Sequence, residues 1–163
     1  MFEIINLEKI EDKIGIKFNK KEYLIEALSH RSYLNEKPGF RALYGLVDGH
    51  NERLEHLGDS VLGLVIAEKL YCNYPGREGD LTAIKSHFVN GNNMAEISDK
   101  IELEKFLFMG HGEINNELGR KSKIANALEA LIAAIFIDQG YDKAKEFINN
   151  FFLYDLPNFY PWL

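Results

Sequence analysis

Two long segments, residues 51–74 and 120–139, are apolar on nearly every face of a helix, and they constrain the fold more than any other feature of the sequence. A helix that is apolar all round lies in the centre of a domain, with other helices packed around it. Strand signals are scarce, because there is little period-two alternation and no Asn-Gly hairpin between β-branched runs. The sequence therefore predicts an all-α fold.

Helical spacing recurs along most of the remaining chain and predicts the outer elements of this fold. Further helices are expected at 3–14, 20–30, 79–90, 92–102 and 141–152. Residues 35–50 contain glycines and a proline and are typical of a loop, which would border the start of the first central helix. With 163 residues, of which 46% are apolar, the chain suits one domain over 1–152. The aromatic segment 153–163 has two prolines and is expected to be an extended tail.

Charge and cysteine content limit the partners and the compartment. The net charge is −6, and the excess of acids lies entirely after residue 50. A negative chain has no strong general attraction for nucleic acid, since that attraction comes mainly from lysine and arginine. The acid excess itself is just as often only a solvated surface with no function. The single cysteine, Cys72, excludes an internal disulfide and fits a reducing, cytoplasmic setting. No signal peptide and no run of 18 apolar residues is present, so no membrane association is expected.

An unusual set of acids opens the first central helix. Glu52, Glu55 and Asp59 are spaced i, i+3 and i+7, so all three fall on one face. Gly58 lies beside them and costs the helix up to about 1 kcal/mol relative to alanine. Acids crowded on one face repel each other unless a cation lies between them, and Mg²⁺ prefers carboxylate oxygens and water. The missing side chain at Gly58 would let a ligand or another helix approach closely.

The second central helix carries a matching polar pair. Asn126 and Glu129 are spaced i, i+3 within the otherwise apolar run 122–136. Two polar pairs on two core helices would form a carboxylate-rich pocket of the kind in which helical bundles hold metals. The apolar positions around them are expected to lie in the core: Leu128, Leu131, Ile132 and Ile135.

Ordinary ion pairing explains the same acids without a metal. Glu52 could pair with a lysine or arginine of a neighbouring helix, and Arg53 could pair with either Glu55 or Asp59. Acids at these spacings are common in helices. The spacing alone therefore leaves both interpretations open, and the polar pair in the second helix favours the metal site.

Several stretches of the chain resemble the catalytic domain of the ribonuclease III family. The segment HNERLEHLGDSVL at 50–62 is similar to the signature motif of the family. Three further segments resemble its flanking regions in the same order: ALSHRSYLNE at 27–36, YPGREGDLTAIKSHFVN at 74–90, and GHGEINNELGRKSKIANALEALIAAIFIDQGY at 110–141. The resemblance covers roughly residues 20–150.

The resemblance implies a Mg²⁺-dependent endonuclease that cuts double-stranded RNA, with Mn²⁺ as a possible substitute and RNA precursors such as those of rRNA as substrates. It also implies an all-helical domain that forms a symmetric homodimer. The metal-site positions of the family fall on Glu55, Asp59, Asn126 and Glu129, and its additional acids fall on Glu52 and Glu78. Among these, we expect Asp59 and Glu129 to bind the metal directly.

The chain departs from the family pattern at two positions. The family usually has an aspartate where this chain has Asn126, which removes one negative charge and should weaken metal binding. The frequent phenylalanine of the signature is replaced by His56, at a position that packs across the dimer interface in the family. The predicted interface consists of Leu54, His56 and Leu57.

The remaining expectations concern RNA. Arg120, Lys121 and Lys123 form the densest basic cluster, GRKSK at 119–123, and are expected to contact the RNA backbone or else to serve only solubility. No double-stranded RNA-binding domain follows the nuclease domain in this chain. Two alternative functions stay open: an impaired RNA-binding or ribosome-associated scaffold of the same fold, and an all-α nucleotide pyrophosphohydrolase.

Overall fold

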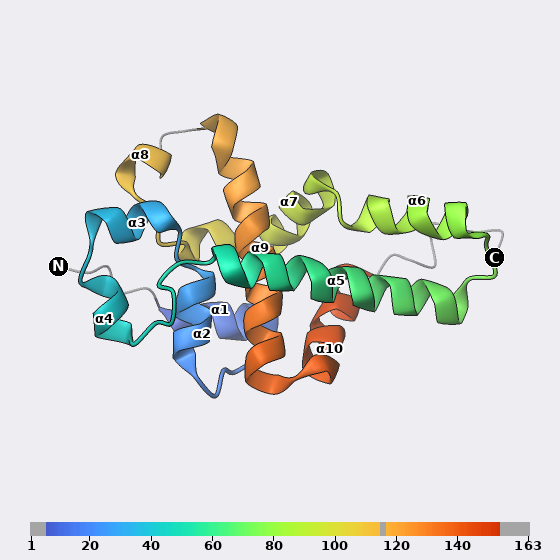
Figure 1. Cartoon of the computed structure of the whole chain (residues 1–163), viewed down its shortest axis with the longest axis horizontal. Helices are drawn as coiled ribbons and strands as arrows, with labels where there is room; N and C mark the ends of the chain where they lie inside the picture. The colour runs from blue at the N-terminus through green and yellow to red at the C-terminus, as the bar shows by residue number, and fades with distance from the viewer. Residues whose placement is uncertain (1–5, 115–116, 154–163) are drawn as a thin grey trace.

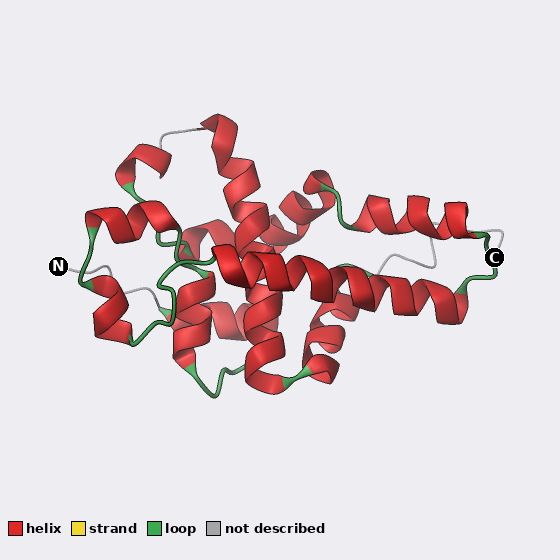
Figure 2. Ribbon diagram, in the orientation of Figure 1, coloured by secondary structure: helices red, strands yellow, loops and turns green. Residues whose placement is uncertain are grey.

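The computed structural model describes residues 6–114 and 117–153, and within them every regular element is a helix (Figure 2). The all-α prediction is therefore confirmed. In chain order the elements are α1 (Leu7–Ile14), α2 (Lys21–Ala27), α3 (Arg31–Glu36), α4 (Phe40–Tyr44), α5 (Glu52–Asn73), α6 (Glu78–Phe88), α7 (Gly91–Lys100), the short 3₁₀ helix η1 (Leu103–Phe106), α8 (His111–Ile114), α9 (Glu117–Gln139) and α10 (Tyr141–Phe151).

Helices α5 and α9 form the centre of the molecule and cross near the start of α5 (Figure 1). Their inner faces are fully buried, as the sequence predicts for Leu128, Leu131, Ile132 and Ile135. Helices α2, α7 and α10 pack around α9, while α6 runs back along the second half of α5. The pair of α5 and α6 extends from the body of the domain as an arm (Figure 1).

The helices predicted at 51–74, 79–90, 92–102, 120–139 and 141–152 are present within a few residues of their expected bounds. The helix expected at 20–30 is shorter and ends at Ala27. It ends there because Ser29 forms a parallel bridge with Phe108, and the side chain of His30 then accepts a hydrogen bond from the Ser32 backbone at the start of α3.

The prediction of a loop over 35–50 is wrong in part. This segment contains α4 and the last residues of α3, two helices too short to show a helical period in the sequence. Phe40 at the start of α4 is fully buried and packs against Tyr33 and Phe108, with ring centroids 5.1 and 4.8 Å away. Tertiary packing of aromatic rings, rather than local periodicity, accounts for this segment.

Buried polar groups connect this segment to the start of α5. The carboxylate of Glu26 is 4% exposed and accepts backbone hydrogen bonds from Val47 and Asp48, each at 3.0 Å. Asn51, which is equally buried, donates its backbone N–H to the carbonyl of Ser29 at 2.9 Å. These bonds fix the entry of the chain into α5, and the sequence alone did not indicate them.

No helix within the described part of the chain combines the length and the apolar character needed to cross a bilayer. The tail expected over 153–163 lies outside the described residues, apart from Leu153, which is buried.

Candidate cation site

The closest approach of the two central helices occurs at Gly58. A Cβ atom placed on Gly58 would lie 1.8 Å from the backbone oxygen of Glu129 and 2.5 Å from its carbonyl carbon. Only glycine fits here, so the close approach allowed by the missing side chain is that of another helix. The contact brings the acidic face of α5 against the polar pair of α9.

Three carboxylates are crowded at this crossing. Burial raises the pKa of Glu129 to about 7, and the charges of Asp59 and Glu55 push it in the same direction. Burial and then the charge of Glu52 raise the pKa of Glu55 as well. Glu55 and Glu129 are half-buried, whereas Asp59 is exposed. The helices thus hold acids together although their charges repel.

Asn126 has the opposite effect on the pKa of Glu55. The side-chain amide of Asn126 lowers the pKa of Glu55 and so acts against the burial and the charge of Glu52, which raise it. Glu55, Asp59, Asn126 and Glu129 are therefore brought together, as their spacing in the sequence suggests.

The two additional acids behave differently. Glu52 stands 3.4 Å from Arg31 and 4.0 Å from the Nδ1 atom of His50, so it is engaged in ordinary ion pairing. Arg53 pairs with Asp48 at 2.8 Å instead of with the acids of its own helix. Glu78 begins α6 at the tip of the arm, away from the α5–α9 crossing (Figure 1). Within one chain, Glu78 does not join the site.

The donor set at the crossing suits a hard divalent cation. Among the described residues, no group of three or more His, Cys, Asp or Glu side chains is arranged to hold a metal ion by itself. Mg²⁺ needs only one or two protein carboxylates, because it keeps several of its waters. Two carboxylates with a neutral amide oxygen beside them match that requirement, and a cation would offset both the burial and the repulsion that raise the pKa of Glu129.

The basic cluster is mostly engaged with acids of the same chain. The guanidinium of Arg120 pairs with Glu104. Lys123 is only 17% exposed and pairs with Glu113 at 2.7 Å. Lys121 is exposed. Backbone N–H groups favour phosphate in the first turn of a helix. Because α9 begins at Glu117, Lys123 lies beyond that turn.

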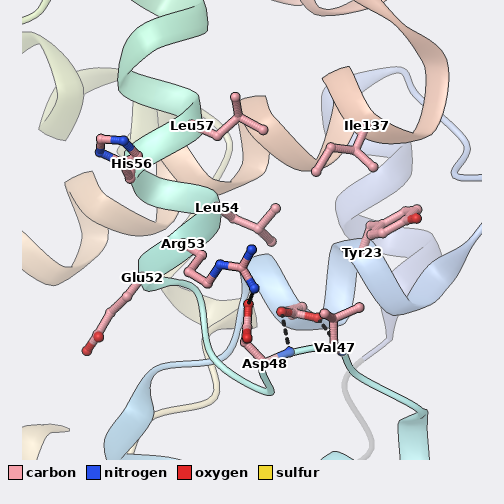
Figure 3. Close-up of a pocket in the computed structure, with 10 residues that line it drawn as sticks. Tyr23, Val47, Asp48, Glu52, Arg53, Leu54, His56, Leu57 and Ile137 are labelled. Carbon is pink, nitrogen blue, oxygen red and sulfur yellow. Dashed lines mark hydrogen bonds and ion pairs between the residues drawn. The ribbon is translucent and has the colours of Figure 1, made fainter.

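An apolar pocket of about 500 Å³ lies beside the start of α5. It is lined by Tyr23, Glu26, Val47, Asp48, Glu52, Arg53, Leu54, His56, Leu57 and Ile137. Figure 3 shows Leu54 and Leu57 turned towards Tyr23 and Ile137, while His56 points away from them.

The predicted interface residues Leu54, His56 and Leu57 all line this pocket. Leu54 is buried within the chain, Leu57 is half-buried and His56 is exposed. Val47 and Ile137 stand at the rim with 61% and 42% of their surface exposed, and the sequence did not single them out.

Comparison with known proteins identifies the family. The model of the Ribonuclease-III-like family matches residues 20–156. The nuclease domain of the ribonuclease III of Campylobacter jejuni superposes with a TM-score of 0.79 at 35% identity, covering 93% of this chain and 99% of that domain. The chain belongs to the ribonuclease III family.

Full-length relatives extend well beyond this chain. Ribonuclease 3 of Leptospira interrogans is 47% identical over 145 residues, which are 88% of this chain and 56% of that protein. Ribonuclease 3 of Dehalococcoides mccartyi strain CBDB1 is 37% identical over 151 residues, which are 91% of this chain and 61% of that protein. The chain thus spans a little over half the length of these members of the ribonuclease III family.

Proposed function

We propose that this chain is the catalytic part of an endoribonuclease that hydrolyses double-stranded RNA with Mg²⁺, for which Mn²⁺ substitutes. Family membership supports the reaction class. The observation that carries the proposal is the α5–α9 crossing, where the backbone contact at Gly58 holds Glu55 and Asp59 against Asn126 and Glu129. If the crossing served only to stabilise the fold, apolar side chains at these positions would stabilise it better than acids do.

Each side chain of the site has a distinct role in this proposal. Asp59 and Glu129 bind the cation through their carboxylates, and Asn126 adds a neutral oxygen. Glu55, whose pKa Asn126 lowers, either joins the ligands or holds a water. When bound, the cation supplies an activated water and neutralises charge on the leaving 3′-oxygen. A side-chain nucleophile is not required.

We also propose that the chain acts as a homodimer. The Campylobacter jejuni structure is described as showing flexibility in a region involved in dimer formation. In this chain the apolar pocket beside α5 offers Leu54 and Leu57 together with the exposed Val47 and Ile137 as a surface for a second copy. Any supporting role for Glu78 depends on such a copy, because within one chain it lies away from the crossing.

Recognition of RNA would rest on shape rather than on strong electrostatic attraction. The net charge of −6 gives little general pull on a duplex. Lys121 is available at the surface of α9, whereas Arg120 and Lys123 would have to exchange their present acidic partners for phosphate. Contacts to 2′-hydroxyls and backbone fit a substrate class of structured RNA precursors, rRNA among them, in a reducing cytoplasm.

Cleavage of an end-labelled RNA duplex tests this function. We expect Mg²⁺-dependent cleavage of the duplex, no cleavage in EDTA, and little cleavage of the separated single strands. Glu129→Gln should lower the rate by at least about two orders of magnitude, because losing a ligand weakens charge stabilisation in the transition state. Glu36→Gln, which changes an acid outside the crossing, is the matched control. Duplex binding without cleavage would instead identify a scaffold.

A further inference from the structure

The acidic face of α5 continues beyond the crossing into a cleft between α5 and α6, which lie side by side in the arm (Figure 1). Asp59 and Gly63 are spaced i, i+4, and Ala67 follows at the same spacing, so the three residues share one face of the helix. Ala67 lines the cleft, which has a volume of about 400 Å³ and walls from both helices. The cleft therefore opens on the same face of α5 as the acids.

Lys85 of α6 reaches across this cleft to α5. It is half-buried and lines the cleft, and a Cβ atom placed on Gly63 would lie 3.2 Å from its Nζ atom and 3.4 Å from its Cε atom. Since Cβ atoms four residues apart on a helix are about 6 Å apart, the ammonium lies within about 9 Å of the Cβ atom of Asp59. Glycine at position 63 leaves the room that the lysine side chain occupies.

The Lys85 ammonium differs from other lysines that reach a second part of the fold. Lys13, Lys123 and Lys145 each pair with an acid of another segment, at 2.5 to 2.7 Å. Lys85 forms no hydrogen bond or ion pair with any residue in 6–114 or 117–153. Its three N–H donors are thus available beside the acids of the crossing.

We propose that the ammonium of Lys85 binds a phosphate of the RNA strand that is cut at the crossing. A phosphate that approaches a cation at Asp59 with one oxygen presents its other anionic oxygen to a neighbouring donor, and an ammonium forms strong, charge-assisted hydrogen bonds with such an oxygen. The inference deepens the proposed function and rests on it for the substrate, a double-stranded RNA. It places one positive charge next to the site in a chain whose net charge is −6.

The position of Lys85 in the last turn of α6 has a simpler explanation, which makes a different prediction. A cation in the last turn stabilises a helix through its macrodipole. In that case, removal of the charge lowers the melting temperature and leaves RNA binding unchanged. A phosphate contact has the reverse signature, because it acts only when RNA is bound.

Binding of a fluorescently labelled RNA duplex, measured by anisotropy over a series of KCl concentrations, tests the contact. Ca²⁺ takes oxygen ligands as Mg²⁺ does and is used to fill the cation site. Lys85→Met keeps an unbranched stem in the cleft and removes the charge. It should weaken binding about three- to tenfold at low salt and make the dependence of log Kd on log[KCl] shallower by about one, since one fewer counterion is released.

Three variants complete the comparison. Lys85→Gln also removes the charge and should behave as Lys85→Met does, whereas Lys85→Arg should bind RNA as the wild type does. Lys9→Met removes a charge at an exposed position of α1 and is the matched control, with no change expected. Melting curves of each variant show whether it folds as the wild type does.

The outcomes separate this inference from the proposed function. Lys85→Met should bind Mn²⁺ at least as tightly as the wild type, because the lysine is not a ligand of the cation. Unchanged duplex affinity and salt dependence in both Lys85→Met and Lys85→Gln would overturn the inference and leave the proposed function intact. A wild type that neither binds nor cleaves the duplex would overturn both.

Discussion

At the scale of single residues, Gly58 accounts for the geometry of the site, because it allows the close approach of α5 and α9. Burial and the charges of Asp59 and Glu55 raise the pKa of Glu129, and the missing side chain at Gly58 lets the two helices approach closely enough for this. The sequence pattern predicted that Gly58 admits a close neighbour. It could not predict that the Glu129 backbone is what meets Gly58, because that contact depends on how α9 is rotated against α5.

Gly58→Ala should destabilise the chain by about 1 to 3 kcal/mol, because the new methyl group meets immovable backbone atoms of Glu129. The gain in helix propensity, up to about 1 kcal/mol, only partly offsets this cost. Gly63→Ala on the same helix is the matched control. There the added Cβ would lie 3.2 Å from the flexible Nζ end of Lys85, so the stability should stay the same or rise slightly. Urea unfolding of both variants measures the difference, and equal stabilities would contradict the packing described for Gly58.

At the scale of elements, long periodic helices were predictable and short connectors were not. The apolar faces of α5 and α9 extend over five or more turns and dominate any periodicity. Helices α3 and α4 have six and five residues, too few to show a period, and depend on aromatic packing at Phe40. The ion pair between Glu102 and Lys13 also depends on a tertiary contact, here between α1 and the start of η1.

The pH dependence of stability offers a prediction at this scale. Hydrogen bonds from Lys105 and then Lys13 lower the pKa of Glu102 from 4.5 to about 2. Because the pKa is lower in the folded state, the stabilisation is complete above pH 4.5 and disappears as the pH falls towards about 2. Glu102→Gln should therefore be less stable than the wild type at pH 6 and equally stable near pH 2.

Urea unfolding across this pH range measures the effect of Glu102→Gln. The carboxylate is on the surface, so high salt should shrink the difference at pH 6. A difference between wild type and variant that does not change with pH would show that the ion pairs to Lys13 and Lys105 contribute nothing.

At the scale of the whole molecule, the single chain leaves apolar surface uncovered beside the site. Val47 and Ile137 are exposed at the rim of a pocket whose walls include Leu54 and Leu57. A two-fold interface would cover the same patch on both copies. The predicted residues Leu54 and Leu57 belong to this patch, whereas Ile137 comes from α9, which is distant in the sequence, and Val47 comes from the loop before α5.

Sedimentation velocity should show a particle of twice the chain mass at micromolar concentrations. Ile137→Glu places a charge in the apolar interface and should shift the chain to monomer without a large change in melting temperature, since Ile137 is exposed in the single chain. Asn150→Glu adds the same charge on the exposed side of α10 and should leave the dimer intact. A wild type that sediments only as a monomer would refute the proposed assembly.

Binding of Mn²⁺, followed by the loss of the free-ion signal in electron paramagnetic resonance, tests the central claim most directly. The wild type should bind the ion, and Mg²⁺ should displace it from the same site. Asp59→Asn and Glu129→Gln should each weaken binding about tenfold or more, because each removes a charged ligand. Glu36→Gln should bind as the wild type does. Unchanged affinity in both Asp59→Asn and Glu129→Gln would contradict a cation site at the crossing of α5 and α9.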